Sequence, residues 1–185
     1  GGALQAWHGE HAGDLLGHGV AAAGDLDADG FADLLLAAPG DDLAGWDAGR
    51  VLALSGADGT PLQQWTGAAP GTWLLTAAGL GDVNGDGYGD VGLGVPGAGA
   101  HEQGRVRVMS GADGQPLHVL DGDVSFGWLG AALIGPGDLD GDGRADVVAG
   151  APGSDDVLDV VGLLSAYGCP SAPIGPTGAR AQADF

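Results

Sequence analysis

Residues 138–146 read Asp-Leu-Asp-Gly-Asp-Gly-Arg-Ala-Asp, and the same pattern occurs twice earlier in the chain. The earlier copies are Asp-Leu-Asp-Ala-Asp-Gly-Phe-Ala-Asp at 25–33 and Asp-Val-Asn-Gly-Asp-Gly-Tyr-Gly-Asp at 82–90. Each nine-residue loop has oxygen-bearing side chains at positions 1, 3, 5 and 9, and glycine at position 6. Glycine at position 6 permits a sharp reversal of the backbone. Alternate residues of such a turn can point inward together, so each copy predicts a cluster of carboxylates.

Clustered carboxylates repel one another unless a hard cation lies between them. Ca²⁺ fits such a cluster because it accepts about six to eight oxygen ligands in flexible geometry. The backbone carbonyl of position 7 is expected to supply one further ligand in each loop. The sequence therefore predicts three calcium sites, formed by Asp25, Asp27, Asp29, Phe31 and Asp33, by Asp82, Asn84, Asp86, Tyr88 and Asp90, and by Asp138, Asp140, Asp142, Arg144 and Asp146.

An EF-hand loop begins in the same way but needs a glutamate at position 12 and a helix on each side. Position 12 is Leu36, Leu93 and Ala149 in the three copies. Each loop is followed by a short apolar run that ends before a proline, which favours a buried strand over an amphipathic helix. We therefore expect each loop to connect two strands.

The loops begin at residues 25, 82 and 138, so the chain repeats with a period of 57 and then 56 residues. Asp-Gly pairs at 58–59 and 113–114 predict hairpin turns, because this dipeptide tolerates positive φ. Four strands in each repeat are typical of a blade of a β-propeller. We predict an all-β fold with three such repeats of antiparallel strands, at 20–23, 34–38, 50–55 and 61–67, at 75–78, 91–95, 105–110 and 116–122, and at 131–134, 147–151 and 160–165.

The two ends of the chain complement each other. Residues 3–9 match the fourth strand at 61–67, whereas the last repeat has no fourth strand of its own. The N-terminal strand is thus expected to complete the last blade, in its own chain or in a neighbouring one. Residues 156–164 also have helical spacing, so strand and helix both remain open there. The predicted division is into repeats at 10–67, 68–122 and 123–168, an extra outer strand at 3–9 and a Pro/Gly-rich tail at 169–185.

Composition narrows the class of protein. The 185 residues include 40 glycines and 10 prolines but no lysine, and the formal net charge is −20. Such a charge argues against binding of nucleic acid or of anionic membranes, and no apolar run is long enough to insert into a membrane. Cys169 is the single cysteine, which leaves a loosely structured thiol or an intermolecular disulfide open. The chain begins Gly1-Gly2 without a signal peptide, which predicts a mature chain or a fragment.

The pattern resembles the FG-GAP repeat of integrin α-subunit propellers and of many bacterial secreted proteins. The resemblance rests on Leu129-Gly130, on the loop at 138–146 and on Gly-Ala-Pro-Gly at 150–153, and on their partial copies in the first two repeats. Leu16 replaces the family's phenylalanine, and Trp73-Leu74 replaces its aromatic-Gly pair. The resemblance implies calcium in hairpins of the blades and a role in binding or adhesion outside the cell or at its surface. Integrin propellers have seven blades, so three blades imply either part of a longer chain or self-association.

These observations favour a secreted calcium-binding structural or adhesion module that is not an enzyme. No Gly-x-Ser-x-Gly motif is present, and the five histidines have no metal-ligand spacing. An alternative is recognition of an extracellular protein or glycan by the variable connections at 40–49, 97–104 and 153–159. Trp46 is the candidate anchor there, unless it packs on a neighbouring blade. A propeller hydrolase is the less favoured alternative.

Overall fold

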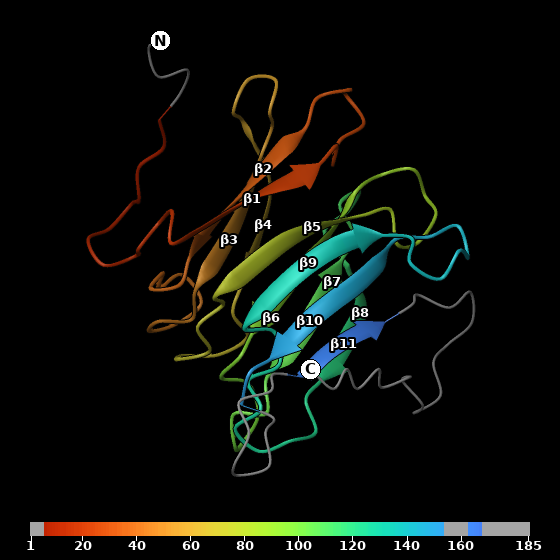
Figure 1. Ribbon diagram of the computed structural model, residues 1–185. Coiled ribbons are helices and arrows are strands. Elements are labelled where there is room, and N and C mark those ends of the chain that lie inside the picture. Colours follow the sequence, from red (N-terminus) through yellow and green to blue (C-terminus); the bar gives the residue numbers. More distant parts are fainter. Residues whose placement is uncertain (1–5, 154–162, 168–185) are drawn as a thin grey trace.

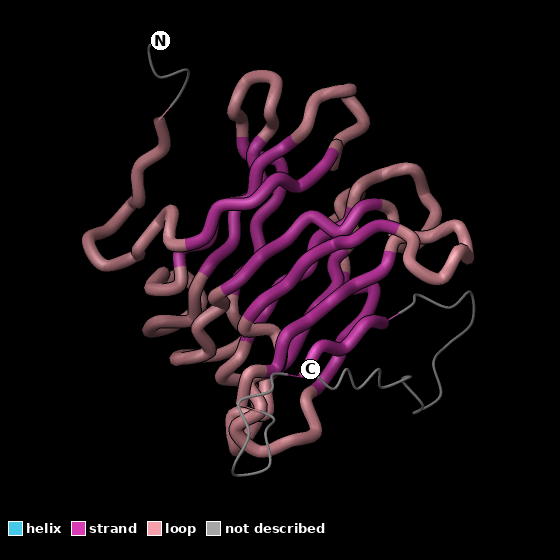
Figure 2. The backbone as a smooth tube through the Cα atoms, viewed as in Figure 1, coloured by secondary structure: helices cyan, strands magenta, loops and turns pink. Residues whose placement is uncertain are grey.

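The computed structural model describes residues 6–153 and 163–167, and this part of the chain contains eleven strands and no helix. The strands form three antiparallel sheets, which we call blades 1, 2 and 3 in chain order (Figures 1 and 2). The strands of blade 1 are β1 (Gly19–Gly24), β2 (Asp33–Ala38), β3 (Arg50–Leu54) and β4 (Pro61–Thr66). Those of blade 2 are β5 (Thr76–Gly81), β6 (Asp90–Val95), β7 (Arg105–Met109) and β8 (Pro116–Asp121), and those of blade 3 are β9 (Ala132–Gly137), β10 (Asp146–Ala151) and β11 (Leu163–Tyr167). The prediction of an all-β fold built from propeller-type blades is confirmed.

Each blade is a meander in which consecutive strands are hydrogen-bonded neighbours, in the order β1-β2-β3-β4, β5-β6-β7-β8 and β9-β10-β11. The second strand is buried in every blade because it has a neighbouring strand on each edge and a packed face. Each aspartate-rich loop joins the first strand to the second, and a register shift marks the end of the ladder next to it. The loops therefore lie at one end of the blades, together with the turns that follow the third strands.

The blades stack through two apolar cores. One core lies between blades 1 and 2 and includes Leu35, Trp65 and Leu93, and the other lies between blades 2 and 3 and includes Leu80 and Val147. The first strands β1, β5 and β9 run side by side through the stack (Figure 1). Within the described residues, no helix is long and apolar enough to cross a membrane.

The approach of β5 to β1 is close enough to require glycine. A Cβ on Gly79 would lie 2.6 Å from the backbone of Ala22 and Ala23. Such a distance lies well inside van der Waals contact, so a side chain at Gly79 would push the two blades apart.

The third strand of the last blade differs from its predicted position. It was expected at 160–165, but β11 spans Leu163–Tyr167. Tyr167 pairs with Val147 in the way that Leu54 pairs with Leu34, so Tyr167 is the counterpart of Leu54. The prediction matched Ser165 to Ser55 and therefore placed the strand three residues too early. The connection before β11 is longer than a match on Ser165 allows, and residues 154–162 lie outside the described part. Of residues 156–164, for which strand and helix were both open, 163 and 164 belong to a strand, and the others lie outside the described part.

The apolar residue before the middle loop is not the one that constant spacing predicts. Trp73 lies nine residues before its loop, as Leu16 and Leu129 do, but Trp73 is 48 % exposed and Leu74 is fully buried. The amide of Leu75 donates to the carbonyl of Gly94 as that of Gly17 donates to Ala37, so Leu74 is the counterpart of Leu16. The segment between this apolar residue and the aspartate-rich loop is one residue shorter in blade 2 than in the other blades. A match at constant spacing could not detect this difference.

The predicted N-terminal strand at 3–9 is not paired into any sheet where it is described. Residues 6–9 have an irregular backbone, and residues 1–5 lie outside the described part. The tail at 169–185 and the thiol of Cys169 also lie outside it. This segment has no strand edge to pair with among the described residues. Blade 1 already has four strands, and the last blade does not lie beside the segment (Figure 1).

Candidate calcium sites

The aspartate at position 1 organises each loop by accepting backbone hydrogen bonds. Asp25 Oδ1 accepts from the amide of Asp29 at 3.1 Å, and Asp25 Oδ2 accepts from the amide of Gly30 at 3.0 Å. Asp82 and Asp138 accept from the corresponding amides of their own loops. The same backbone path therefore recurs in all three copies, as their common sequence predicted.

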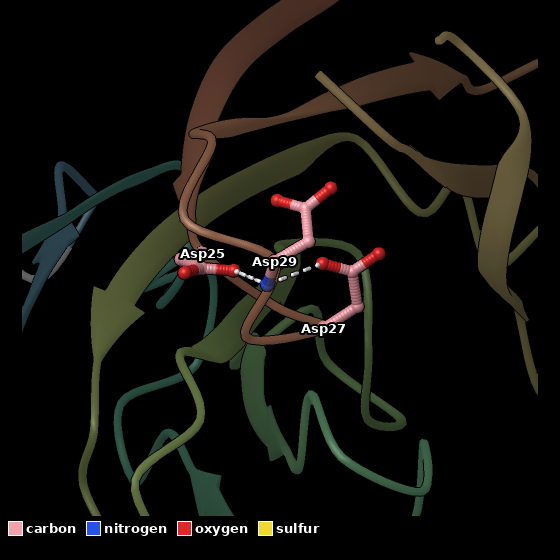
Figure 3. Close-up of side chains that lie close together, drawn as sticks. All are labelled: Asp25, Asp27 and Asp29. Carbon is pink, nitrogen blue, oxygen red and sulfur yellow. Dashed lines mark hydrogen bonds between the residues drawn. The ribbon is translucent and has the colours of Figure 1, made fainter. Parts of the chain in front are cut away.

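Positions 3 and 5 continue this inward arrangement. Asp27 Oδ1 accepts from the amide of Asp29 at 3.2 Å, and Asp29 Oδ1 accepts from the amide of Phe31 at 2.8 Å. Figure 3 shows the three carboxyl groups of Asp25, Asp27 and Asp29 around the turn. One carboxylate oxygen from each of these residues lies within 4.8 Å of the other two. Oxygens at this separation can ligate one hard cation.

The third loop brings together a different subset of its predicted ligands. Asp138, Asp140 and Asp146 have oxygens within 4.8 Å of one another, whereas Asp142 is outside this group. The middle loop has an amide at position 3, and Asn84 Nδ2 donates to Asp86 Oδ2 at 2.9 Å. The ligands predicted at position 7 (Phe31, Tyr88 and Arg144) each donate their amide to the carboxylate at position 5, which places their backbone beside the cluster.

The aspartate at position 9 makes hydrogen bonds beyond its own loop that the sequence did not reveal. Asp33 is buried, and its Oδ2 accepts from the amide of Leu26 at 2.7 Å while its Oδ1 accepts from the amide of Gly56 at 2.9 Å. Asp90 accepts in the same way from Val83 and Gly111. In blades 1 and 2, the position-9 carboxylate therefore connects the loop to the turn that follows the third strand.

The turn that receives this tie is closely fitted to the loop. A Cβ on Gly56 would lie 1.9 Å from the carbonyl oxygen of Ala32, and one on Gly111 would lie 1.9 Å from that of Gly89. The Ser-Gly pairs directly after the third strands of blades 1 and 2, at 55–56 and 110–111, were the signal available in the sequence. In blade 3, Asp146 Oδ1 is buried and has no hydrogen-bond partner among the described residues.

Burial changes the acidity of one of these carboxyl groups. Desolvation raises the pKa of Asp90 to about 6, and repulsion from Asp86 and Asp82 acts in the same direction. Hydrogen bonds from Val83 and Gly111 oppose this shift. In the first loop, desolvation and repulsion from neighbouring carboxylates raise the pKa of Asp27.

Calcium binding by the middle loop is expected to weaken below about pH 6, because a proton then competes with the metal for Asp90. Without metal, protonation of Asp90 has the opposite effect, because it stabilises the folded protein. The pKa of Asp90 in the folded state lies above the unfolded value of about 3.9, so its contribution to stability grows as the pH falls through 6 and is lost as the pH rises through 6. Calcium titrations at about pH 5 and about pH 7.5, with melting curves in EDTA at the same pH values, measure both effects. Asp90→Asn removes the titrating group and should abolish this part of both pH dependences.

The predicted ligand anchor lies at the opposite end of the blades from the loops. Trp46 is 71 % exposed and does not pack on a neighbouring blade, which was the alternative. Nearby, Trp73, Trp128 and Glu102 line a cleft of about 460 Å³, and Trp128 Nε1 donates to Glu102 Oε2 at 2.9 Å. The sequence did not single out Trp73 and Trp128 as surface residues, because Trp73 occupied an apparent core position and Trp128 preceded one.

Comparisons with known proteins agree with this architecture. The family model of the FG-GAP repeat matches residues 16–54, 75–109 and 131–165, and the chain belongs to the FG-GAP repeat family. It is 34 % identical to integrin alpha-PS2 of Drosophila melanogaster over 81 % of this chain and 12 % of the relative. It is 32 % identical to integrin alpha-5 of Xenopus laevis, over 94 % of this chain and 18 % of the relative. The chain thus spans less than a fifth of the length of these relatives.

A solved structure supports the fold. The Bacillus licheniformis rhamnogalacturonan lyase PL11 superimposes with a TM-score of 0.50 and 17 % sequence identity, over 80 % of this chain and 32 % of the lyase. At this identity the likeness concerns the arrangement of the strands alone. It assigns no activity to this chain.

Proposed function

We propose that the chain is a calcium-stabilised module for adhesion or binding outside the cell or at its surface. The observation that carries the proposal is the recurrence of one carboxylate-lined backbone path in all three loops, in a chain with FG-GAP repeats and similarity to integrin α chains. We propose that the module acts by binding and not by catalysis. The repeat boundaries at 10–67, 68–122 and 123–168 are the units that we assign to it.

Electrostatics supports a metal in these loops. They hold eleven of the 25 acidic residues of the chain (four, three and four), and three calcium ions would change the formal charge from −20 to −14. Because the carboxylates repel one another in the metal-free state, metal binding and folding should be coupled. Extracellular modules bind calcium with dissociation constants of about 10⁻⁴ to 10⁻³ M, a range suited to calcium-rich surroundings.

Isothermal titration of the metal-free protein with CaCl₂ tests the proposal and is expected to give three sites per chain. Asp29→Asn and Asp142→Asn, each at position 5 of its loop, should each remove or weaken one site. Asp113→Asn is the matched control, since Asp113 is an exposed aspartate in a hairpin turn outside the loops. Absence of binding, or equal stoichiometry and affinity in all variants, would contradict the proposal.

Recognition through the other end of the blades is the second function that we propose, because exposed tryptophans gather there. Trp46 comes directly before Asp47, whose carbonyl accepts from the amide of Trp73, so these two side chains belong to neighbouring segments. An extracellular protein or glycan is the ligand class proposed for this end, with Trp46 as an anchor. A screen of the calcium-loaded protein on immobilised glycans and matrix proteins should give binding that Trp46→Ala weakens. Binding unchanged by this substitution would remove Trp46 from the site.

The partner that we propose in addition is a further propeller blade, from a longer parent chain or from a second copy of this chain. Blade 3 has three strands in the described residues, one fewer than blades 1 and 2. The side of blade 3 that lacks a strand is the edge of β11.

A further inference from the structure

Adjacent blades pack by one rule throughout this chain. Successive residues of a strand point to opposite faces of the blade. We call the face toward the next blade along the chain the front face, and the other the back face. In the first strands, Ala21 and Ala78 lie on front faces, and Ala77 and Leu133 lie on back faces. All four pack against the cores between blades, so each core joins a front face to a back face.

At each end of the stack, one face has an exposed first-strand residue, although the opposite second-strand residues Leu36 and Val148 are buried. Val20 is the counterpart of Ala77 and Leu133, but it is 64 % exposed on the back face of blade 1. Ile134 is the counterpart of Ala78, but it is 56 % exposed on the front face of blade 3. Both residues would be covered if the front face of blade 3 in one copy of the chain packed on the back face of blade 1 in a second copy. Blades 1 and 2, and blades 2 and 3, already pack front to back in this way within the chain.

The N-terminal segment already lies where the outer strand of a preceding blade would lie. In blade 1, Trp65 of the fourth strand donates its indole N–H to the carbonyl of Gly114, in the turn after the third strand of blade 2, at 3.1 Å. Trp7 donates its indole N–H to the carbonyl of Gly59, in the turn after the third strand of blade 1, at 3.4 Å. Trp7 thus contacts blade 1 in the way that a fourth-strand residue contacts the next blade.

An ion pair between an exposed glutamate and a buried arginine also joins this segment to blade 1. Arg50 at the start of β3 is buried, and its Nη2 lies 2.8 Å from Asp41 Oδ2. Its Nη1 lies 3.3 Å from Glu10 Oε1, three residues after Trp7. Residues 6–10 are therefore fixed to blade 1 at two points, although they form no strand.

The sheet that this segment could join lies at the other end of the stack. Blade 3 is complete in the described residues except for a fourth strand beside β11, and the order in blades 1 and 2 places the fourth strand beside the third. Figure 1 shows the N-terminal segment beside the sheet of β1 to β4 and β11 at the far side of the molecule. Since two blades separate them, the fourth strand and the sheet that lacks one do not meet within the described chain.

We propose that copies of this chain join head to tail, with blade 3 of one copy docking on blade 1 of the next. The front face that carries Ile134 covers the back face that carries Val20. Residues 6–9 of the second copy pair, as a fourth strand, with the edge of β11 that has no neighbouring strand among the described residues. This inference identifies the surfaces for the self-association that we propose above. It rests on the repeat geometry and not on calcium. A contact of this heterologous kind closes into a ring if the rotation between copies permits, and otherwise continues as a filament.

Sedimentation velocity and native mass spectrometry of the calcium-loaded chain test the proposal. The chain of 17.9 kDa is expected to form particles of two or more copies. Val20→Asp and Ile134→Asp should each abolish growth beyond single copies, and Trp7→Ala should weaken it. Val20 and Ile134 are exposed in the single chain, so these substitutions should leave its folding intact. Val119→Asp is the matched control, an exposed strand residue of the middle blade that should have no effect.

Mixing the two blocked variants gives a sharper result. A Val20→Asp copy keeps an intact blade 3, and an Ile134→Asp copy keeps an intact blade 1. Each alone should be a single copy, and the mixture should form a pair that grows no further. A single copy for the unsubstituted chain at every concentration, or assemblies unchanged in both variants, would overturn the inference.

The same samples distinguish this outcome from failure of the calcium proposal. A chain that stays a single copy but binds three calcium ions overturns head-to-tail docking alone. A chain that assembles without binding calcium overturns the calcium sites alone.

Discussion

Removal of calcium with EDTA should lower the melting temperature of the protein by about 10 °C or more. Each site adds RT ln(1 + [Ca²⁺]/Kd) to the free energy of unfolding, which is about 1.4 to 2.7 kcal/mol at a calcium concentration of 10 to 100 times Kd. Three sites together contribute about 4 to 8 kcal/mol, and a chain of this size changes its melting temperature by about 2 to 4 °C for each kcal/mol. The physical cause is the repulsion among the carboxylates that each ion offsets.

Differential scanning calorimetry in EDTA and in calcium measures this difference, with magnesium as the matched ion. Mg²⁺ requires near-octahedral geometry and gives up its water reluctantly, so it should restore less of the melting temperature than calcium. Equal melting temperatures in EDTA and in excess calcium would show that the loops hold no stabilising metal.

Asp33→Ala should destabilise the protein by about 3 to 5 kcal/mol even in EDTA. The substitution leaves the buried amide of Leu26 without its acceptor, which costs about 1 to 3 kcal/mol. It also removes the hydrogen bond from the exposed Gly56 to a charged carboxylate, and such a bond contributes about 1.5 to 3 kcal/mol. Gly56 belongs to the turn after β3, so the loss also separates the loop from that turn. This effect should not depend on metal, because both hydrogen bonds of Asp33 join protein groups.

Asp29→Ala is the matched comparison within the same loop. Asp29 is exposed and belongs to the carboxylate cluster, so its removal should reduce the stabilisation by calcium but leave stability in EDTA nearly unchanged. Urea denaturation of both variants, with and without calcium, separates the two roles. A free energy of unfolding in EDTA that is the same for Asp33→Ala and Asp29→Ala would disprove the clamp role of Asp33.

Most of the strands could be predicted from local pattern. A loop with alternating aspartates sets its own path, because its hydrogen bonds join residues two to five positions apart. A short apolar run closed by proline then has few alternatives to a buried strand. For this reason the second strands were predicted to within one residue in all three blades.

The errors arose where spacing along the chain does not report position in space. Trp73 and Leu74 are adjacent in the sequence and both are apolar. Only the stacking of blade 2 on blade 1 decides that Leu74 is buried and Trp73 is not. The register of β11 depends on its pairing with β10 across a connection of variable length. Propensity does not distinguish such neighbouring registers.

The sequence by itself determined that this chain has three repeated blades, each with a carboxylate-lined turn, because those features depend on residues close together in the chain. Only the tertiary structure decided that Asp33 and Asp90 clamp distant turns, that Trp46, Trp73 and Trp128 are exposed at the opposite end, and that Trp7 lies on blade 1. These facts depend on contacts between residues about 20 to 50 positions apart, which form only when the strands pair and the blades stack. Burial and hydrogen bonding across such separations follow from packing, and packing is a property of the folded chain.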